Sequence, residues 1–125
     1  MPRHSRRGDS GDAGIATVWA ATAVAALVLV AGGMFWIGSA VLARHRAAGA
    51  ADLAALAAAG RTHRGVDDAC GLARGISERM HARLRTCTVE SWDVLVQVEV
   101  DLPGPLATLG PARGRARAGP VQRLP

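Results

Sequence analysis

The stretch AGIATVWAATAVAALVLVAGGMFWIGSAVLA, residues 13–43, determines how the rest of the chain is interpreted, because it contains no charged residue. A membrane-spanning helix needs about 20 apolar residues, and a shorter run of roughly 10–14 is typical of a buried core helix. The apolar part of a secretory signal has roughly 7–15 residues. The run therefore predicts a membrane anchor at about residues 15–42. The small residues Gly38-Ser39-Ala40 leave one alternative open, which is cleavage by a signal peptidase.

The composition allows one small domain after the anchor. The chain has 125 residues, and its two cysteines, Cys70 and Cys87, both follow the apolar run. A domain of this size has a thin core and benefits from a covalent link. The formal net charge of +5 is carried by arginine, since the sequence contains no lysine.

The chain is expected to divide into four regions. Residues 1–12 are short and charged, and are interpreted as a disordered cytoplasmic leader. Residues 13–60 are interpreted as one long helix, because alanine and leucine continue beyond the membrane boundary until Gly60 supplies a C-terminal cap. Residues 61–102 are expected to form a small outer domain, and residues 103–125 a tail rich in Gly, Pro and Arg or an edge strand. The expected fold class is α+β.

The outer domain is expected to consist of one helix packed on a β-hairpin. Asp67 is interpreted as the N-cap of a helix that runs to about Met80. In DVLVQVEVDL, residues 93–102, apolar residues then alternate as in a strand with one apolar face. RLRTCTVE, residues 83–90, is the expected hairpin partner, with the turn at Ser91-Trp92.

The arginine-rich segment near the C-terminus has two interpretations. Arg113, Arg115 and Arg117 alternate with small residues, which fits an exposed edge strand whose small residues face inward. Glycine and proline at both ends, together with the lack of a large apolar side chain, fit a solvated tail equally well. A third strand therefore stays open on the sequence alone.

Cys70 and Cys87 are predicted to form a disulfide between the second helix and the hairpin. If the chain reverses near residues 81–82, Cys70 lies about 16 Å before the reversal at helical rise, and Cys87 lies about 16 Å after it at strand rise. The two sulfur atoms would then lie at the same distance from the reversal, so that a disulfide could join the helix to the strand. Two free thiols in a cytosolic domain are the alternative. A zinc site with His63 and His81 is disfavoured, because no C-x-x-C or H-x-x-x-H pair pre-forms half of it.

The orientation of the anchor is predicted from the cysteines. Arginines flank the apolar run on both sides, so the positive-inside rule leaves the orientation nearly undecided. A disulfide persists only on the oxidising side of a membrane. We therefore expect a single-pass protein of the cytoplasmic membrane, with its N-terminus in the cytoplasm and its C-terminal domain outside.

Candidate contacts with other subunits lie on the long helix. Gly32 and Gly33 lie among alanines, and such small residues let helices approach closely in a membrane, although an alanine-rich composition also explains them. Asp52 is the only acid between Asp12 and Asp67. Two interpretations stay open for it: it pairs with an arginine of a neighbouring subunit, or it keeps this part of the helix soluble. The expected partners are membrane lipid and other membrane subunits.

The sequence favours no catalytic function. It contains no spaced pair of carboxylates in an apolar setting, no serine elbow and no glycine-rich phosphate loop after a strand. We therefore expect no enzyme, no cofactor, no metal and no small-molecule substrate. Nucleic-acid binding is disfavoured as well, because no aromatic residues interleave with the C-terminal arginines for base stacking.

The order of these features resembles the TadE/TadG-like proteins of Flp pilus (tight adherence) assembly, most closely the short actinobacterial TadE-like members. The resemblance rests on GIATVW at residues 14–19, AADLAALAAA at residues 50–59, the two cysteines, the valine-rich strand and RARAGP at residues 115–120. It implies a pseudopilin-like subunit whose leader is cut between Gly14 and Ile15. The family's glutamate at the fifth mature position is replaced here by Trp19, which is also a common residue at a membrane interface.

These observations predict a membrane-anchored, TadE-like accessory subunit of a Flp-type pilus or a related secretion apparatus, with a structural role. One alternative is a basic single-pass adaptor whose arginine-rich tail binds an acidic partner or nucleic acid in the cytosol. Another is a small secreted binding domain that is released after Ala40 or Ala43.

Overall fold

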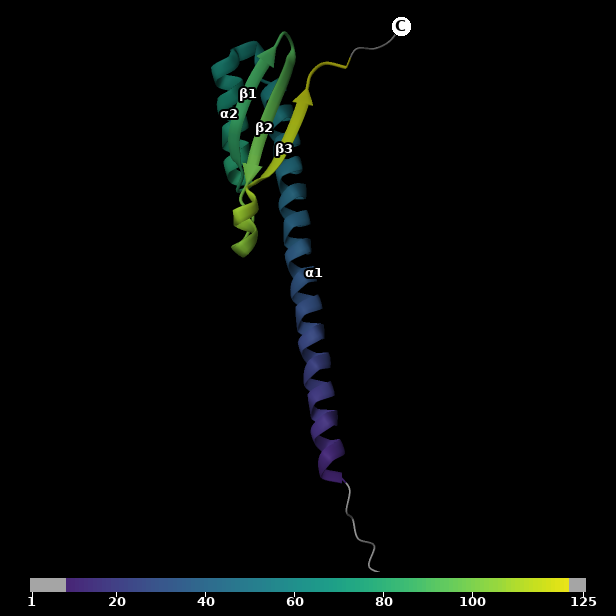
Figure 1. Cartoon of the computed structure of the whole chain (residues 1–125). Coiled ribbons are helices and arrows are strands. Elements are labelled where there is room, and N and C mark those ends of the chain that lie inside the picture. The colour runs from purple at the N-terminus through teal and green to yellow at the C-terminus, as the bar shows by residue number, and fades with distance from the viewer. Residues whose placement is uncertain (1–8, 122–125) are drawn as a thin grey trace, which may run out of the picture. The chain divides into compact units, whose positions relative to one another are not determined.

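The computed structural model describes residues 9–121. Along them lie α1 (Asp9–Ala59), the short 3-10 helix η1 (Thr62–Arg64), α2 (Val66–Arg79), β1 (Arg83–Glu90), β2 (Asp93–Val100), the 3-10 helix η2 (Gly104–Leu109) and β3 (Ala112–Ala118) (Figure 1). The strands form one antiparallel sheet in the order β1-β2-β3. The predicted α+β class is confirmed, and the third strand that the sequence left open is present at a sheet edge.

The chain divides into two units between Trp36 and Ile37. In the first, α1 exposes large apolar side chains all round, with Trp19 exposed to 72% and Leu27 to 69%. Thr17 and Thr22 donate to the backbone carbonyls of Ala13 and Val18, each at 2.8 Å. These hydroxyls therefore need no water, as a lipid environment requires. Within the described residues, α1 is the one helix that is long and apolar enough to cross a membrane.

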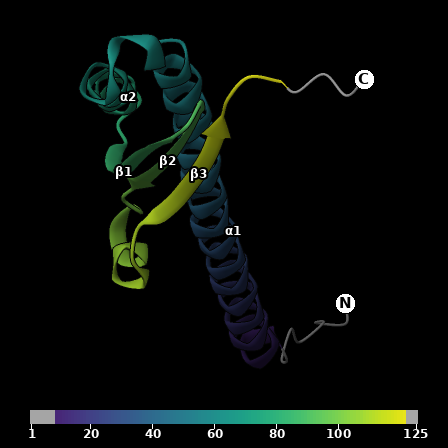
Figure 2. The same ribbon diagram turned by 90° about the horizontal axis from the view of Figure 1, so that it is seen from above.

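The second unit is built on an alanine face of α1. Seven alanines of this face are buried at spacings of three and four residues or in adjacent pairs: Ala43, Ala47, Ala50, Ala51, Ala54, Ala55 and Ala58. Such spacing places them on one side of a helix. They form one core cluster with Ala69 and Ala73 of α2 and with Val94, Val96, Val98 and Val100 of β2. Both helices therefore cover the same face of the sheet (Figure 2).

The close approach of β3 to α1 depends on a glycine. A Cβ atom added at Gly114 would lie 2.1 Å from the carbonyl oxygen of Ala47. No side chain fits at that distance, so glycine and alanine together set the spacing between the strand and the helix. Of the two interpretations of this segment, the edge strand is the one present: Gly114 and Ala118 are buried, Ala116 is partly buried, and Arg113, Arg115 and Arg117 are exposed.

Two helix ends differ from the prediction. Of the leader expected over residues 1–12, residues 1–8 lie outside the described residues, and α1 already begins at Asp9. Asp12 in its first turns is favourable at the positive end of a helix. The N-cap of α2 is Gly65 rather than Asp67, because the φ of 107° at Gly65 lets the chain enter the helix at Val66. Asp67 and Asp68 lie in the first turn instead.

Candidate functional site

The disulfide that joins α2 to β1 is present between Cys70 and Cys87, with their Cα atoms 5.8 Å apart. The chain reverses at His81, which has a φ of 56°, as the sequence predicted. Because both cysteines are bonded to each other, neither supplies a thiolate for zinc. Within residues 9–121, no group of three or more His, Cys, Asp and Glu side chains is arranged to hold a metal ion.

A β-bulge that the sequence analysis missed brings Cys87 to the helix-covered face. The register between β1 and β2 shifts between Leu84 and Thr86, so Arg85 has no partner of its own on β2. Arg85 and Thr86 are consequently both exposed, whereas Leu84 and Cys87 are partly buried. In a strand without the bulge, strict alternation would point Cys87 away from α2. The bulge is thus a condition for the disulfide.

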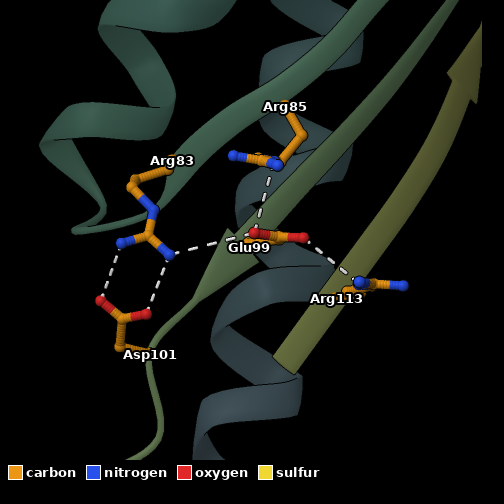
Figure 3. Close-up of polar contacts among 5 residues, drawn as sticks. All are labelled: Arg83, Arg85, Glu99, Asp101 and Arg113. Carbon is orange, nitrogen blue, oxygen red and sulfur yellow. Dashed lines mark hydrogen bonds and ion pairs between the residues drawn. The ribbon is translucent and has the colours of Figure 1, made fainter. Parts of the chain in front are cut away.

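The open face of the sheet carries an arginine cluster around one buried carboxylate, Glu99, whose side chain is 8% exposed (Figure 3). The Nε atom of Arg113 donates to one carboxylate oxygen at 3.2 Å. Arg85 and Arg83 approach the other oxygen at 3.4 and 3.9 Å. Arg83 also donates to both oxygens of Asp101, at 2.9 and 3.0 Å. Glu99 therefore ties all three strands together across the open face.

The arginines predicted as either an edge strand or a solvated tail lie on β3. Arg117 donates to Asp93 through two nitrogen atoms, and this hydrogen bond and the carboxylate charge raise the pKa of the Arg117 guanidinium. Arg113 pairs with Glu99. Arg115 lies opposite Gln97 and, among the described residues, has no carboxylate within ion-pair distance. Arg113 and Arg117 are therefore each paired with a carboxylate within the sheet, although Arg113 shares Glu99 with Arg83 and Arg85.

Asp52 lies on the exposed side of α1, beside the end of β3. It lines an open pocket of about 400 Å³ with Leu56, Arg117 and Gly119. Its side chain forms no ion pair within residues 9–121, where the pairs involve Asp68, Asp93, Glu99 and Asp101. Its carboxylate is thus available to a partner. Whether it makes such a contact stays a prediction.

The remaining candidate residues all lie in the first unit, on α1. Gly14 and Ile15 are within the helix, Trp19 is exposed, and nothing lies within 4 Å of a Cβ placed at Gly14, Gly32 or Gly33. The structure leaves these glycines uncovered, so a neighbouring helix would find room there. Their roles in processing and packing stay predictions. The flanking Arg3, Arg6 and Arg7 lie outside the described residues.

Glu99 and its bulge are the main features that the sequence analysis missed. Glu99 lies between the valines of an alternating strand, and alternation points it away from the core. The available signal was its pairing: the arginines at positions 83 and 113 lie directly opposite Glu99 on both neighbouring strands. Opposite charges on directly opposed positions attract. Finding this requires the register, which the sequence did not provide.

A candidate membrane helix that continues into a small disulfide-linked α+β domain defines the class of this protein. Residues 14–61 match the family model of the Tad proteins, described as Flp pilus-assembly TadE/G-like. The predicted resemblance to TadE/TadG-like proteins is thus confirmed over this segment. The likeness to the short actinobacterial members stays a prediction. No similar curated protein and no similar solved structure was found.

Proposed function

We propose that the chain is a membrane-anchored, TadE-like accessory subunit of a Flp-type pilus or a related secretion apparatus, with a structural and not a catalytic role. The observation that carries this proposal is the family match over residues 14–61, because this segment contains both the candidate membrane helix and the alanine face of α1. The helix anchors the subunit, and the domain presents the arginine-bearing sheet face to its surroundings.

The disulfide supports a domain on the outer side of the membrane. The Cys70–Cys87 bond links the only two cysteines of the chain, and such bonds persist in oxidising compartments. The N-terminus is then cytoplasmic. The alternative of a cytosolic adaptor relied on a free arginine tail and reduced cysteines, and the ion pairs of Arg113 and Arg117 give it little support.

The accessory role does not require cleavage after Gly14. A pilin-type cut between Gly14 and Ile15 would place Trp19 where the family has a glutamate. In pilins this glutamate neutralises the charged N-terminus of a neighbouring subunit, and tryptophan carries no carboxylate that could do so. We therefore propose that the subunit is a permanent anchor and not a polymerising pilin. Lateral contacts at Gly32 and Gly33 belong to the same proposal.

The intact mass of the protein purified from membranes, before and after reduction and alkylation, tests these proposals together. A full-length chain with one disulfide is the expected result. Loss of residues 1–14 would indicate pilin-type processing, and a chain that begins after Ala40 or Ala43 would indicate a secreted domain. Two free thiols would overturn the proposed orientation and favour the cytosolic adaptor.

Asp52 is the proposed contact with partner membrane subunits. The variant Asp52→Ala is expected to reduce co-purification of those subunits, and Asp67→Ala, which removes an exposed acid from α2, serves as a control of equal charge. Unchanged co-purification of Asp52→Ala would remove this residue from the proposal.

A further inference from the structure

A pocket of about 760 Å³ opens where η2 and the start of β3 lie against α1. Arg44, His45 and Ala48 of α1 line one side of it. Leu109, the Gly110-Pro111 turn and the first residues of β3, including Arg113, line the other. All of these residues belong to the second unit of the chain.

This pocket lies at the end of the domain that adjoins the apolar run. Arg44 is the first charged residue after residues 13–43, and Ile37 and Leu42 just before it are exposed to 68% and 58%. The start of β3 lies at this end, since Gly114 contacts Ala47. η2, which joins β2 to β3, lies at the same end of the sheet (Figure 1). The first basic residues after a spanning segment lie at the level of the lipid headgroups.

The charges of the pocket suit a phosphate group. Arg113 uses its Nε atom for Glu99, which leaves its terminal N–H groups for another acceptor. Arg44 has no ion-pair partner among the described residues, and His45 adds a ring nitrogen to the lining. Among residues 9–121, no carboxylate lines the pocket. A zwitterionic headgroup would therefore bring an ammonium group beside two guanidinium groups without a carboxylate in the lining to pair with it, whereas an anionic headgroup would not.

An apolar side chain completes the pocket. Leu109 is exposed to 76%, although it ends a short helix whose other leucine, Leu106, is partly buried. Gly110 has a φ of 89°, a conformation that glycine adopts without strain, and it turns the chain from η2 into β3 directly after Leu109. A leucine at the headgroup level lies against the glycerol and the first acyl carbons of a lipid, which removes its surface from water.

We propose that this pocket binds the phosphodiester of an anionic phospholipid, with the guanidinium groups of Arg44 and Arg113 on the phosphate and Leu109 against the glycerol end of the acyl chains. The bound lipid links η2 and β3 to the membrane surface and fixes the domain at its leaflet. The inference needs the membrane anchor only. It holds for either orientation of the chain and does not depend on the pilus role.

Native mass spectrometry of the full-length protein released from nanodiscs tests the proposal. The discs contain phosphatidylcholine and phosphatidylglycerol in equal amounts, and the ratio of the two lipids retained on the protein is measured. Two arginines at a membrane surface predict a preference for phosphatidylglycerol of roughly thirtyfold. Arg44→Gln should reduce it about fivefold, and Leu109→Ser should reduce total lipid retention.

Arg115→Gln is the control, because it removes one arginine charge from the domain, as Arg44→Gln does, but lies on β3 outside the pocket. The preference for phosphatidylglycerol should be unchanged in this variant. An equal loss in Arg44→Gln and Arg115→Gln would indicate general attraction by the charge of the domain and would overturn the site. No preference in the wild-type protein, or one that Arg44→Gln leaves unchanged, would overturn it as well. Displacement of phosphatidylglycerol by inorganic phosphate would assign the pocket to free phosphate instead of a lipid.

Discussion

The two parts of α1 are both rich in alanine and differ in what they bury. Before Trp36 the helix exposes its large apolar side chains, such as Leu27 and Met34, each to 69%. Between Ala43 and Ala58 it buries the seven alanines of its alanine face completely or nearly so, and it leaves Leu53 and Leu56 exposed to 50% and 63%. On this part of the helix, the face that lies in the protein core carries small side chains and the larger apolar side chains lie outside it.

The reason lies in how close the sheet comes. Because a glycine of β3 packs on the carbonyl of Ala47, the face of α1 beside this strand has room for the methyl groups of alanine and not for larger side chains. The core that results is thin, since its largest fully buried side chains are Val94, Val98 and Ser77. Such a core buries little apolar area, so the domain depends on its disulfide and its ion pairs for more of its stability than a larger domain would. The N-terminal part of α1 has no such dependence.

The largest expected effect comes from one methyl group at Gly114. Gly114→Ala places a Cβ 2.1 Å from a backbone oxygen of α1, and relief requires the strand to move off the helix. We expect a loss of more than about 3 kcal/mol of domain stability, at the upper end of overpacking effects. Hydrogen exchange of the β2 amides in detergent-solubilised full-length protein measures it.

Gly33→Ala is the matched substitution in the other part of the helix. Nothing lies within 4 Å of the added Cβ there, and alanine favours a helix over glycine by about 1 kcal/mol. Exchange of the β2 amides should therefore be unchanged. If Gly114→Ala also left the exchange of the β2 amides unchanged, the close packing of β3 on α1 would be wrong, and the comparison between the two parts of the helix would fail.

Removal of the disulfide should have the next largest effect. In the Cys70→Ala/Cys87→Ala variant, the loss of a link across a sequence separation of 17 residues costs about 3 kcal/mol by the chain-entropy model. We expect faster exchange throughout β1 and β2, while circular dichroism retains the helical signal of the N-terminal part of α1. Unchanged exchange in the sheet would mean that the alanine and valine core suffices without its covalent link.

The sequence predicted the elements of the domain and missed the contacts that depend on register. Valine alternation over residues 93–102 predicted the second strand of the hairpin, because periodicity is local, and the expected partner over residues 83–90 placed the turn at Ser91-Trp92. The reversal at residues 81–82 was enough to bring Cys70 level with Cys87. The bulge at Arg85 could not be predicted, since no residue type marks it. Without the bulge, the sheet face of Cys87 and the ion-pair partners of Glu99 cannot be assigned. The exposure of Leu56 beside buried alanines likewise depends on the approach of the sheet.

The ion-pair cluster should contribute less than the core contacts. Glu99→Gln leaves Arg83, Arg85 and Arg113 close together without their shared carboxylate. Breaking a fully buried pair costs about 3–5 kcal/mol, but these arginines are more than half exposed, so we expect a loss of about 1–2 kcal/mol. Urea-dependent exchange of the β2 amides measures it. Glu78→Gln, on the exposed side of α2, is the control and should be neutral. A neutral Glu99→Gln would show that the cluster orients the strands without stabilising them.

The smallest effect on domain stability is expected at Leu56, although the loss of a large apolar side chain is usually costly. Leu56→Ser removes a large apolar side chain from the domain part of α1, yet that residue is already 63% exposed, so the change in unfolding free energy should stay within about 0.5 kcal/mol. Val98→Ala, which shortens a fully buried side chain, should cost about 1–3 kcal/mol in the same exchange measurement. A loss above about 1 kcal/mol for Leu56→Ser would mean that another molecule covers this leucine in the full-length protein. The domain part of α1 would then resemble the membrane part in presenting its large apolar side chains to a partner and not to water.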